Sequence, residues 1–446
     1  MLLKFFLNLR SFRRFSASAN SVTSLLSCVD SSAINSSLND ISRENQSHFD
    51  VCSSNFGGED VNGGDNDCLS CDDDVKLRVK PRLDEPALIK LKNERNPDRL
   101  FQLFKENARN RVVVENRYAF EDTVSRLAGA GRYDYIEDLL EDQKALPQGR
   151  REGFIVRIIM LYGRAGMVKQ AVDTFYNMHL FRCKRTVKSL NATLKVLTQA
   201  RDLEAISSFL KEAPCEFGVE LDVISMNIVV SAFCRMGVLD KAYLVTVEME
   251  KQGIKPDVVT FTTLISAFYK CGRWEIGNGL WNLMVFKGCF PNVATFNARI
   301  QFLVSRGRAW SANDLLLLME KLGIPPDEIT YNLVIKGFFE AGFLDMAMRV
   351  YSALHGRGCK ANLQIYQTMV HYLCKAGHFD SAYNMCKECL KKNWTINVGT
   401  ICVLLKGLKS VGSVHNAWMI IGLVEKRRPP FPVTQLDAFK SILGKR

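Results

Sequence analysis

Several features that mark enzymes and membrane proteins are missing from this chain of 446 residues. No apolar run is long enough to cross a bilayer. The chain has no Gly-x-x-x-x-Gly-Lys-Ser/Thr phosphate loop and no Gly-x-Ser-x-Gly nucleophile elbow. No acids cluster as a two-metal nuclease site would require. We therefore expect no membrane span, no small-molecule substrate and no enzymatic activity.

Metal-binding patterns are also absent, although there are 14 cysteines and six histidines. No histidine is followed two positions later by glutamate, so the zinc-deaminase signature is missing. A structural zinc site needs two Cys pairs at short separation, whereas Cys68–Cys71 and Cys386–Cys389 lie far apart in the chain. We expect no metal and no cofactor.

Charge is present in excess, but it is unevenly spread behind the net value of +12. Residues 1–25 hold four basic residues and no acid, while residues 26–75 hold eleven acids against Arg43 alone. The remaining residues, 76–446, therefore carry a net charge of +18. A basic body of this kind favours a polyanionic partner, which charge alone leaves open as nucleic acid, membrane surface or acidic protein.

Glycine recurs at a constant interval of 35 residues in the second half of the chain, at Gly237, Gly272, Gly307, Gly342, Gly377 and Gly412. Around each glycine the same pattern repeats. Within 258–292, apolar residues at i, i+3, i+4 and i+7 predict one helix before the glycine, and a second apolar stripe follows it. The glycine is typical of a left-handed helix C-cap, and Pro291 ends the second helix.

A lone helical pair cannot cover its own apolar faces, so neighbouring pairs must stack into one continuous core. The chain is therefore predicted to be all-α, a right-handed α-solenoid of stacked 35-residue helix-turn-helix repeats. A degenerate helical pair is expected over 82–116, an array of about nine units over 117–432, and a C-terminal capping helix and tail over 433–446. The unit 187–222 is one residue longer than the others and has Arg201 where glycine is expected.

The N-terminal 25 residues combine Arg, Ser and apolar residues without an acid, which is typical of an organelle-targeting peptide. We predict import into the mitochondrial matrix, with the plastid as the alternative and a disordered tail as the neutral interpretation. In a reducing matrix the cysteines are expected to be mostly free thiols. Residues 26–81 are predicted to be an acidic disordered linker.

The stretches Gly253-Ile-Lys-Pro-Asp257, Asp257-Val-Val-Thr-Phe-Thr-Thr-Leu-Ile and Glu328-Ile-Thr-Tyr-Asn-Leu-Val-Ile resemble the pentatricopeptide repeat, and so does the 35-residue period. The resemblance covers 117–432 and, weakly, 82–116. Within this family, the chain is similar to the plain class of plant organellar members, which carry no appended catalytic domain.

The resemblance implies binding of single-stranded organellar RNA at about one base per repeat. In the family, the fifth and last residues of a unit recognise a base edge. The corresponding pairs are Asn191 with Asp222, Asn227 with Asp257, Thr262 with Asn292, Asn297 with Asp327, and Asn332 with Asn362. By the same resemblance these pairs favour U, U, A, U, and then C or U, with the RNA running 5′ to 3′ along the chain.

Family members also stack each base between second-position side chains and contact phosphates near the end of the first helix. The stacking platforms would be Lys188, Ile224, Val259, Ala294 and Ile329, and the phosphate contacts Arg164, Arg235, Lys270 and Lys375. Glu340 departs from the basic pattern. We assign no base to the units with Glu121, Val156, Gln367 or Cys402 in fifth position.

A structural alternative exists for each pair, because Asp and Asn at a helix start are common N-caps. Two functions also remain in play. The first is an RNA-binding factor in mitochondrial RNA processing, stability or translation. The second is a structural component of the mitochondrial ribosome or another ribonucleoprotein, held partly by protein contacts. A pure protein scaffold is a third alternative, against which the basic first-helix residues argue.

Overall fold

The computed structural model describes residues 86–356, 358–428 and 430–444, and these residues form α-helices, short 3₁₀ turns and connecting loops without a strand. The predicted targeting peptide, 1–25, and the predicted acidic linker, 26–81, lie outside the described residues, as do Cys68 and Cys71. None of the described helices is both long enough and apolar enough to cross a membrane.

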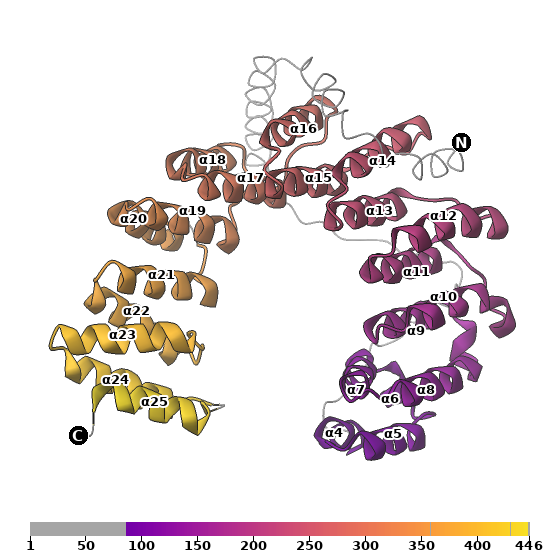
Figure 1. The fold of residues 1–446 in the computed structure, drawn as a ribbon, viewed down its shortest axis with the longest axis horizontal. Helices are drawn as coiled ribbons and strands as arrows, with labels where there is room; N and C mark the ends of the chain where they lie inside the picture. Colours follow the sequence, from indigo (N-terminus) through magenta and orange to yellow (C-terminus); the bar gives the residue numbers. More distant parts are fainter. Residues whose placement is uncertain (1–85, 357, 429, 445–446) are drawn as a thin grey trace, which may run out of the picture. The chain divides into compact units, whose positions relative to one another are not determined.

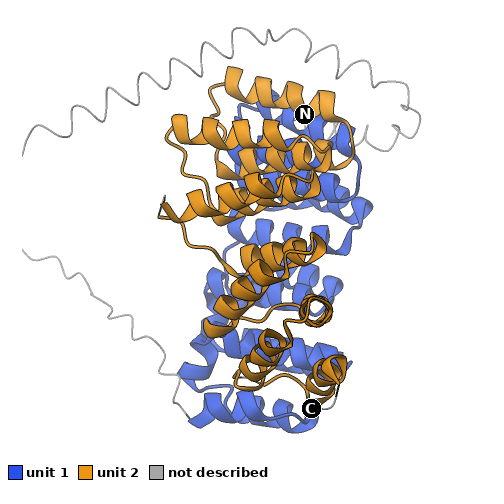
Figure 2. Cartoon of the chain, turned by 90° about the vertical axis from the view of Figure 1, so that its left-hand side faces the viewer, with its two compact units in different colours: residues 1–22, 55–267 blue, residues 23–54, 268–446 orange. Residues whose placement is uncertain are grey.

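The described residues divide into two compact units, and the boundary in the chain falls inside α15 (Val258–Lys270), between Ala267 and Phe268 (Figure 2). The first unit holds α4 (Pro86–Asn93), α5 (Pro97–Glu106), α6 (Arg111–Glu115), α7 (Arg117–Gly129), α8 (Tyr133–Ala145), α9 (Glu152–Arg164), α10 (Val168–Tyr176), α11 (Val187–Ala200), α12 (Leu203–Phe217), α13 (Val223–Arg235) and α14 (Leu239–Lys251).

The second unit begins in α15 and continues with the same alternation of first and second helices (Figure 1). It holds α16 (Trp274–Phe286), α17 (Val293–Ser305), α18 (Ala309–Lys321), α19 (Glu328–Glu340), α20 (Leu344–Gly356), α21 (Leu363–Lys375), α22 (Phe379–Lys391), α23 (Val398–Ser410), α24 (Val414–Glu425) and α25 (Val433–Leu443).

Within each unit, a first helix packs on the second helix of its own repeat and on the first helix of the next repeat. In the first unit α9 packs on both α10 and α11, and α11 packs on α13. In the second unit α17, α19, α21 and α23 follow one another in the same way (Figure 1). Both units are therefore stacks of helical pairs, as the all-α solenoid prediction requires.

Each regular repeat has two residues with a left-handed backbone conformation. One follows the first helix, where Gly237, Gly272 and their equivalents all have φ between +70° and +82°. The other follows the second helix, where glycines 35 residues apart run from Gly218 to Gly358 and Asn393 takes the next place with φ +59°. Arg201 adopts φ +59° at the expected glycine, so the longer repeat keeps the same left-handed turn despite the strain that a side chain brings there.

The core contains an aromatic side chain at the fourth position of many first helices. These rings are less than 4% exposed: Phe120, Phe261, Phe296, Tyr331 and Tyr366. Each such ring buries enough apolar surface to stabilise the fold by about 2 kcal/mol. This fixed inward position leaves the second and fifth positions of the same helices on another face.

The N-terminal end differs from the predicted helical pair, because three helices precede the array. The short α6 (Arg111–Glu115) follows α4 and α5 and is capped by Asn110, whose side chain accepts from the backbone N–H of Val112. Its buried Val113 and Val114 add apolar surface against the next repeat. The sequence pattern did not show this helix because five residues span little more than one turn.

Candidate nucleic-acid interface

The last residue of each regular repeat is the N-cap of the first helix that follows. Asp222, Asn292, Asp327 and Asn362 have extended backbone and accept a hydrogen bond from the backbone N–H three residues later. Asp257 makes the same bond to Thr260, at 2.8 Å. The capping interpretation of these residues is therefore correct, and capping accounts for about 1 kcal/mol of helix stability at each site.

Three of these caps also bind the fifth-position asparagine of the preceding first helix. The amide Nδ2 donates to the Asp Oδ1 at 3.1 Å in Asn191–Asp222, 3.0 Å in Asn227–Asp257 and 3.1 Å in Asn297–Asp327. We call these the three Asn–Asp pairs; the first two lie in the first unit and the third in the second unit. Capping and pairing thus coexist, since one carboxylate oxygen serves both.

A buried hydroxyl at the third position of the next helix completes each pair. Ser225, Thr260 and Thr330 are buried, and their hydroxyls lie 2.6, 2.5 and 2.6 Å from the Oδ1 of the paired asparagine. The same hydroxyls lie 2.8–2.9 Å from the Asp Oδ1. The capping-box spacing of Ser or Thr three residues after Asp was visible in the sequence, but its link to the asparagine was not.

The surrounding groups fix which way each asparagine amide points. A carboxylate can only accept, so the amide nitrogen must face the aspartate. The amide oxygen then faces the hydroxyl, which can donate to it. These bonds use one N–H and one lone pair of the amide, which has another N–H and another lone pair. Each pair therefore presents an adjacent donor and acceptor in a defined order.

The three aspartates remain charged in the folded protein. Burial alone raises the pKa of Asp222, Asp257 and Asp327, but hydrogen bonds from the capped backbone N–H, the asparagine amide and the hydroxyl lower it by more. The net pKa of each carboxyl therefore lies below the ordinary 3.8. Ionised carboxylates make stronger acceptors, which holds the amides more firmly.

The fifth predicted pair lacks this support. Asn362 caps Ile365 through a 3.1 Å bond, and an isoleucine at the third position has no hydroxyl to offer. The Oδ1 of Asn332 is buried and has no hydrogen-bond partner within the described part of the chain. Its amide is consequently less constrained than those of the three Asn–Asp pairs.

The third predicted pair divides between the two units, with Thr262 in the first and Asn292 in the second. Asn292 is a full capping-box residue, because its Oδ1 accepts from the backbone N–H and the hydroxyl of Thr295, each at 3.0 Å. Asparagine therefore serves as a cap in this protein as well as aspartate does.

The predicted stacking platforms are all exposed at the second position of first helices. Ile224, Val259 and Ile329 are 55–60% exposed, and Lys188 and Ala294 are exposed as well. Tyr118 also occupies a second position, at the start of α7, and is 82% exposed. Tyr118 is not among the predicted platforms because Glu121, the fifth residue of its repeat, does not suit base recognition.

The predicted phosphate-binding cations end their first helices, but they are not equivalent. Arg235, Lys270 and Lys375 are exposed. Arg164 instead lies 3.2 Å from Glu121, which also pairs with Arg117 at 2.9 Å. At the equivalent position, Glu340 accepts a hydrogen bond from the Tyr372 hydroxyl at 2.7 Å. This acid, which departs from the basic pattern, therefore contacts the next repeat.

In the repeats without a base assignment, the fifth and last positions hold other kinds of residue or make other contacts. Gln367 donates to the backbone oxygen of Thr395 at 3.2 Å, and Asn397 caps Gly399 at 2.8 Å. Val156 and Cys402 are half-buried side chains with no amide to present. These positions are left without a base assignment.

Metal-ligating groups do not converge anywhere in the described residues. Cys386 and Cys389 lie on α22, where both are buried, and burial raises the pKa of the Cys389 thiol to about 11. Thiols of this kind stay protonated at neutral pH and behave as small apolar residues.

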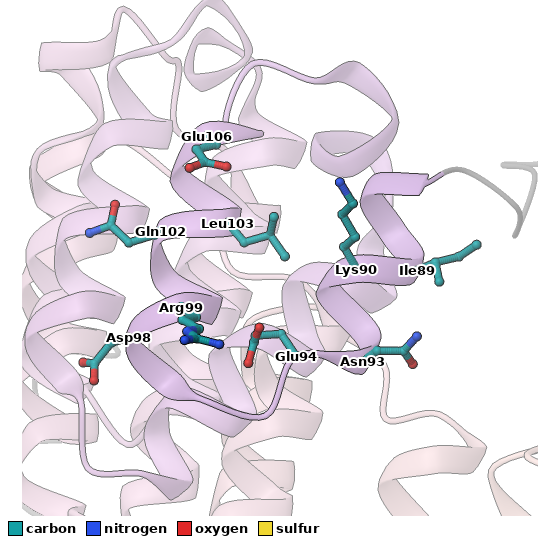
Figure 3. A pocket seen from close by; sticks show the side chains of 9 residues that line it. All are labelled: Ile89, Lys90, Asn93, Glu94, Asp98, Arg99, Gln102, Leu103 and Glu106. Atoms are coloured by element: carbon teal, nitrogen blue, oxygen red, sulfur yellow. The ribbon is translucent and has the colours of Figure 1, made fainter.

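A cavity of about 670 Å³ lies between α4 and α5 (Figure 3). Its lining is mixed in charge, with Lys90 and Arg99 beside Glu94, Asp98 and Glu106. This balance gives no preference for an anion, so the cavity does not extend the predicted nucleic-acid interface.

Comparison with known proteins gives a consistent result. A family model described as the PPR repeat family matches residues 221–270, 256–301 and 291–340, and a model of the PPR repeat matches 157–183, 329–359 and 365–394. A mitochondrial pentatricopeptide repeat-containing protein of Arabidopsis thaliana is 65% identical over 176 residues, which are 40% of this chain and 44% of that protein.

Two ribosomal proteins of the same plant are also similar. Small ribosomal subunit protein mS79 (rPPR3b) of Arabidopsis thaliana is 35% identical over 39% of this chain and 44% of its own length. The protein named small ribosomal subunit protein mL103 (rPPR7) is 30% identical over 354 residues, covering 79% of this chain and 85% of its own length. The chain thus spans less than half of the first two relatives but most of the third.

Proposed function

Because this chain belongs to the pentatricopeptide repeat family, we propose that it binds single-stranded RNA in mitochondria and recognises bases through the three Asn–Asp pairs. The observation that carries the proposal is the repetition of one polar arrangement in Asn191–Asp222, Asn227–Asp257 and Asn297–Asp327, with nearly identical distances. Stability alone requires only the caps, whereas the half-buried asparagines add an ordered donor and acceptor at each repeat.

The order of donor and acceptor matters because uracil and cytosine differ in just this respect. Uracil offers an N–H beside a carbonyl, and cytosine offers a ring nitrogen acceptor beside an amino group. An asparagine amide held in one orientation suits one of the two bases, and a reversed amide suits the other. The fixed amides of the three Asn–Asp pairs therefore support discrimination between these two bases. The family resemblance assigns U to these pairs, and C or U to the pair that contains Asn332.

The neighbouring side chains supply the other contacts that a bound nucleotide needs. Ile224, Val259 and Ile329 are exposed apolar groups on which a base can stack. The exposed cations Arg235, Lys270 and Lys375 would neutralise the negative charge of backbone phosphates. The protein would act by occupying or remodelling RNA, in RNA processing, stability or translation, without a chemical step of its own.

The mitochondrial location rests on two observations. A relative that is 65% identical over 176 residues is named as mitochondrial. The first 25 residues also have the composition of a targeting peptide, with four basic residues and no acid.

A second candidate function is a structural place in the mitochondrial ribosome. It is favoured by the similarity to rPPR7, a small ribosomal subunit protein, over 79% of this chain. It is also favoured by the small number of well-formed Asn–Asp pairs, because the RNA sequence that they would specify is too short to be unique in an organelle transcriptome. Sedimentation separates the two candidates, because a ribosomal component follows a subunit after mRNA is digested and a free factor does not.

The test of base recognition exchanges one pair at a time in the full-length chain. Wild type should prefer 5′-UUAUC-3′ over a scrambled RNA. Replacing Asn227→Thr together with Asp257→Asn should move the preference at the second base from U to A by about tenfold, equivalent to about 1.4 kcal/mol. Asparagine still caps the helix, as Asn292 does, so the fold is retained.

The matched variant in the second unit, Asn297→Thr with Asp327→Asn, should shift only the fourth base. Each variant is thus the control for the other, since both make the same chemical change. Equal binding of all these RNAs, with steep salt dependence, would contradict base recognition and leave the structural ribonucleoprotein role as the better explanation.

A further inference from the structure

A second cavity, of about 480 Å³, opens in the second unit beside α16, α17 and α18. We call it the arginine cavity, because its lining includes Trp274, Arg299, Phe302, Arg306, Arg308 and Asp314. Its volume lies in the range of small-ligand sites, which is about 300–1,000 Å³. None of the residues around it occupies the second, fifth, thirteenth or last position of a repeat, so it is separate from the predicted base-recognition and phosphate positions.

The cavity has a surplus of positive charge that the described residues do not neutralise. Arg299, Arg306 and Arg308 face it against a single carboxylate, Asp314. Within the described ranges, none of the three arginines lies in an ion pair. Guanidinium groups gathered around one cavity repel one another, so an anion bound there would lower their energy.

Aromatic rings support the guanidinium groups. The Arg299 guanidinium lies 4.7 Å from the Trp281 ring centre, and that of Arg306 lies 5.7 Å from the Phe302 ring centre. Phe302 itself stacks on Tyr269 at 4.6 Å with an interplanar angle of 9°. These ring contacts leave the N–H groups of Arg299 and Arg306 for a stronger acceptor such as a phosphate oxygen.

Trp274 supplies a different surface at the same cavity. It is the first residue of α16 and is 43% exposed. An exposed indole beside unpaired arginines is suited to a ligand that has both a flat ring and a negative charge.

We propose that the arginine cavity binds a nucleotide of single-stranded RNA outside the Asn–Asp pairs, with the phosphate on Arg306 and Arg308 and the base on Trp274. The proposal rests on the proposed RNA-binding function and adds a second contact site to it. Such a contact does not depend on base identity, because every base has a face that can stack.

The two kinds of contact lie close together along the chain. Asn297 is on α17, and Arg306 is the C-cap residue directly after that helix, so the two are nine residues and about 13 Å apart along its axis. An RNA that is bound at Asn297–Asp327 and continues by a few nucleotides can therefore reach the cavity. A free mononucleotide would gain only the local contact and should bind weakly.

The test compares 5′-UUAUC-3′ with the same pentamer carrying flanking nucleotides on both sides, using the full-length chain. Wild type should bind the longer RNA more tightly. The variant Arg306→Gln with Arg308→Gln should lose most of this gain, and the slope of log K against log salt should fall by about 0.7 for each phosphate contact removed. Base preference at the Asn297–Asp327 pair should not change.

The control variant is Arg349→Gln with Lys391→Gln, which removes two exposed cations from second helices of the same unit. It makes the same change in net charge and should keep the gain from flanking nucleotides. If this control loses as much as the cavity variant, the effect is one of overall charge and the proposal is wrong.

Trp274 is tested separately, since loss of stacking and loss of charge have different signatures. Trp274→Ala should weaken binding of the longer RNA about tenfold without altering the salt slope, and Trp274→Phe should restore most of the affinity. Photocrosslinking from 4-thiouridine in the flanks should label the peptide that contains Trp274 in the wild type.

The outcomes distinguish this proposal from the function on which it rests. Unchanged affinity and slope in the cavity variants, with an intact base preference in the wild type, would overturn the cavity proposal alone. Absence of RNA binding by the wild type would overturn both.

Discussion

The N-terminal repeats and the regular repeats have the same helical plan but use their polar side chains differently. On α9, Arg157 donates to the backbone oxygens of Val114 and Asn116 at 2.8 and 3.0 Å and lies over the Phe120 ring. In the regular repeats, an asparagine such as Asn227 bonds to a cap and keeps hydrogen-bonding capacity for a ligand.

Other polar side chains of the N-terminal repeats also donate to backbone oxygens of the preceding repeat. Arg126 donates to the backbone oxygens of Leu91 and Glu94, both at 2.6 Å, and Gln143 donates to that of Ala108 at 2.9 Å. These side chains join one repeat to the previous one. The comparison teaches that one helical plan serves two uses of polar side chains: bonds to the backbone of the preceding repeat in the N-terminal repeats, and bonds to the helix caps in the regular repeats.

The largest expected effect concerns the internal bonds. Arg157→Met should lower the free energy of unfolding by about 3 kcal/mol, because two backbone acceptors lose a charged donor. Urea unfolding measures the loss, and hydrogen exchange should place it in α7 and α9. Base preference at Asn227–Asp257 should be unchanged; an altered preference would mean that the two regions are not distinct in function.

The next effect concerns the buried hydroxyls. Thr260→Val removes the group that lies 2.5 Å from the Asn227 amide oxygen, while Asp257 still caps the helix. The discrimination between U and C at the second base should fall by about fivefold, or about 1 kcal/mol, because the amide oxygen loses its donor and only the Asp257 carboxylate still orients the amide. Competition binding with the two RNAs measures this.

The matched control for that variant is Ser225→Thr, which keeps a hydroxyl at the equivalent position of another pair. It should bind the same RNA with the same discrimination as the wild type. Retained discrimination in Thr260→Val would show that the carboxylate alone orients the amide.

A smaller effect is expected from pH. The folded pKa values of Asp222, Asp257 and Asp327 lie below 3.8, so their ionisation adds stability that is fully present above pH 3.8 and is lost as pH falls through the folded pKa. Asp257→Asn should therefore cost the same stability at pH 7 and pH 5, and less below pH 3.8. A cost that already shrinks between pH 7 and pH 5 would contradict the lowered pKa.

The smallest expected effect would make an N-terminal repeat more similar to the regular repeats in its contact with RNA. Glu121→Gln removes the ion-pair partner of Arg164. Because the Arg164 side chain is half exposed, the ion pair is weak, and its loss should make Arg164 only modestly more available to an RNA phosphate. RNA affinity should rise by about twofold at low salt, equivalent to about 0.4 kcal/mol. Glu204→Gln makes the same charge change on the second helix α12 and should raise affinity less.

The helical pairs and their boundaries could be predicted from the sequence because each repeat contains its own signals. Gly272 marks one left-handed turn, and Asp257 marks the start of a helix by a short polar side chain before an apolar run. The extra helix α6 could not be predicted, since its stability depends on burial of Val113 and Val114.

The candidate site was predictable in part. The family resemblance pointed to Asn227 and Asp257, and the structure places them 3.0 Å apart. The role of Thr260 was not predicted, because its contact with Asn227 joins residues of two repeats that are 33 positions apart. The arginine cavity was missed for the same reason, since Trp274 and Arg306 lie on different repeats.

The position of the caps makes the chain divisible in whole repeats. Excising residues 293–327 would join Asn292 directly to Glu328, and Thr330 would stand at the same spacing from its new cap as Thr295 does now. The junction would be chemically equivalent to the natural one, whereas removal of a single residue would displace a cap from its helix. Under the proposed function, gene duplication or deletion in steps of 35 residues therefore lengthens or shortens the RNA footprint by one base at a time.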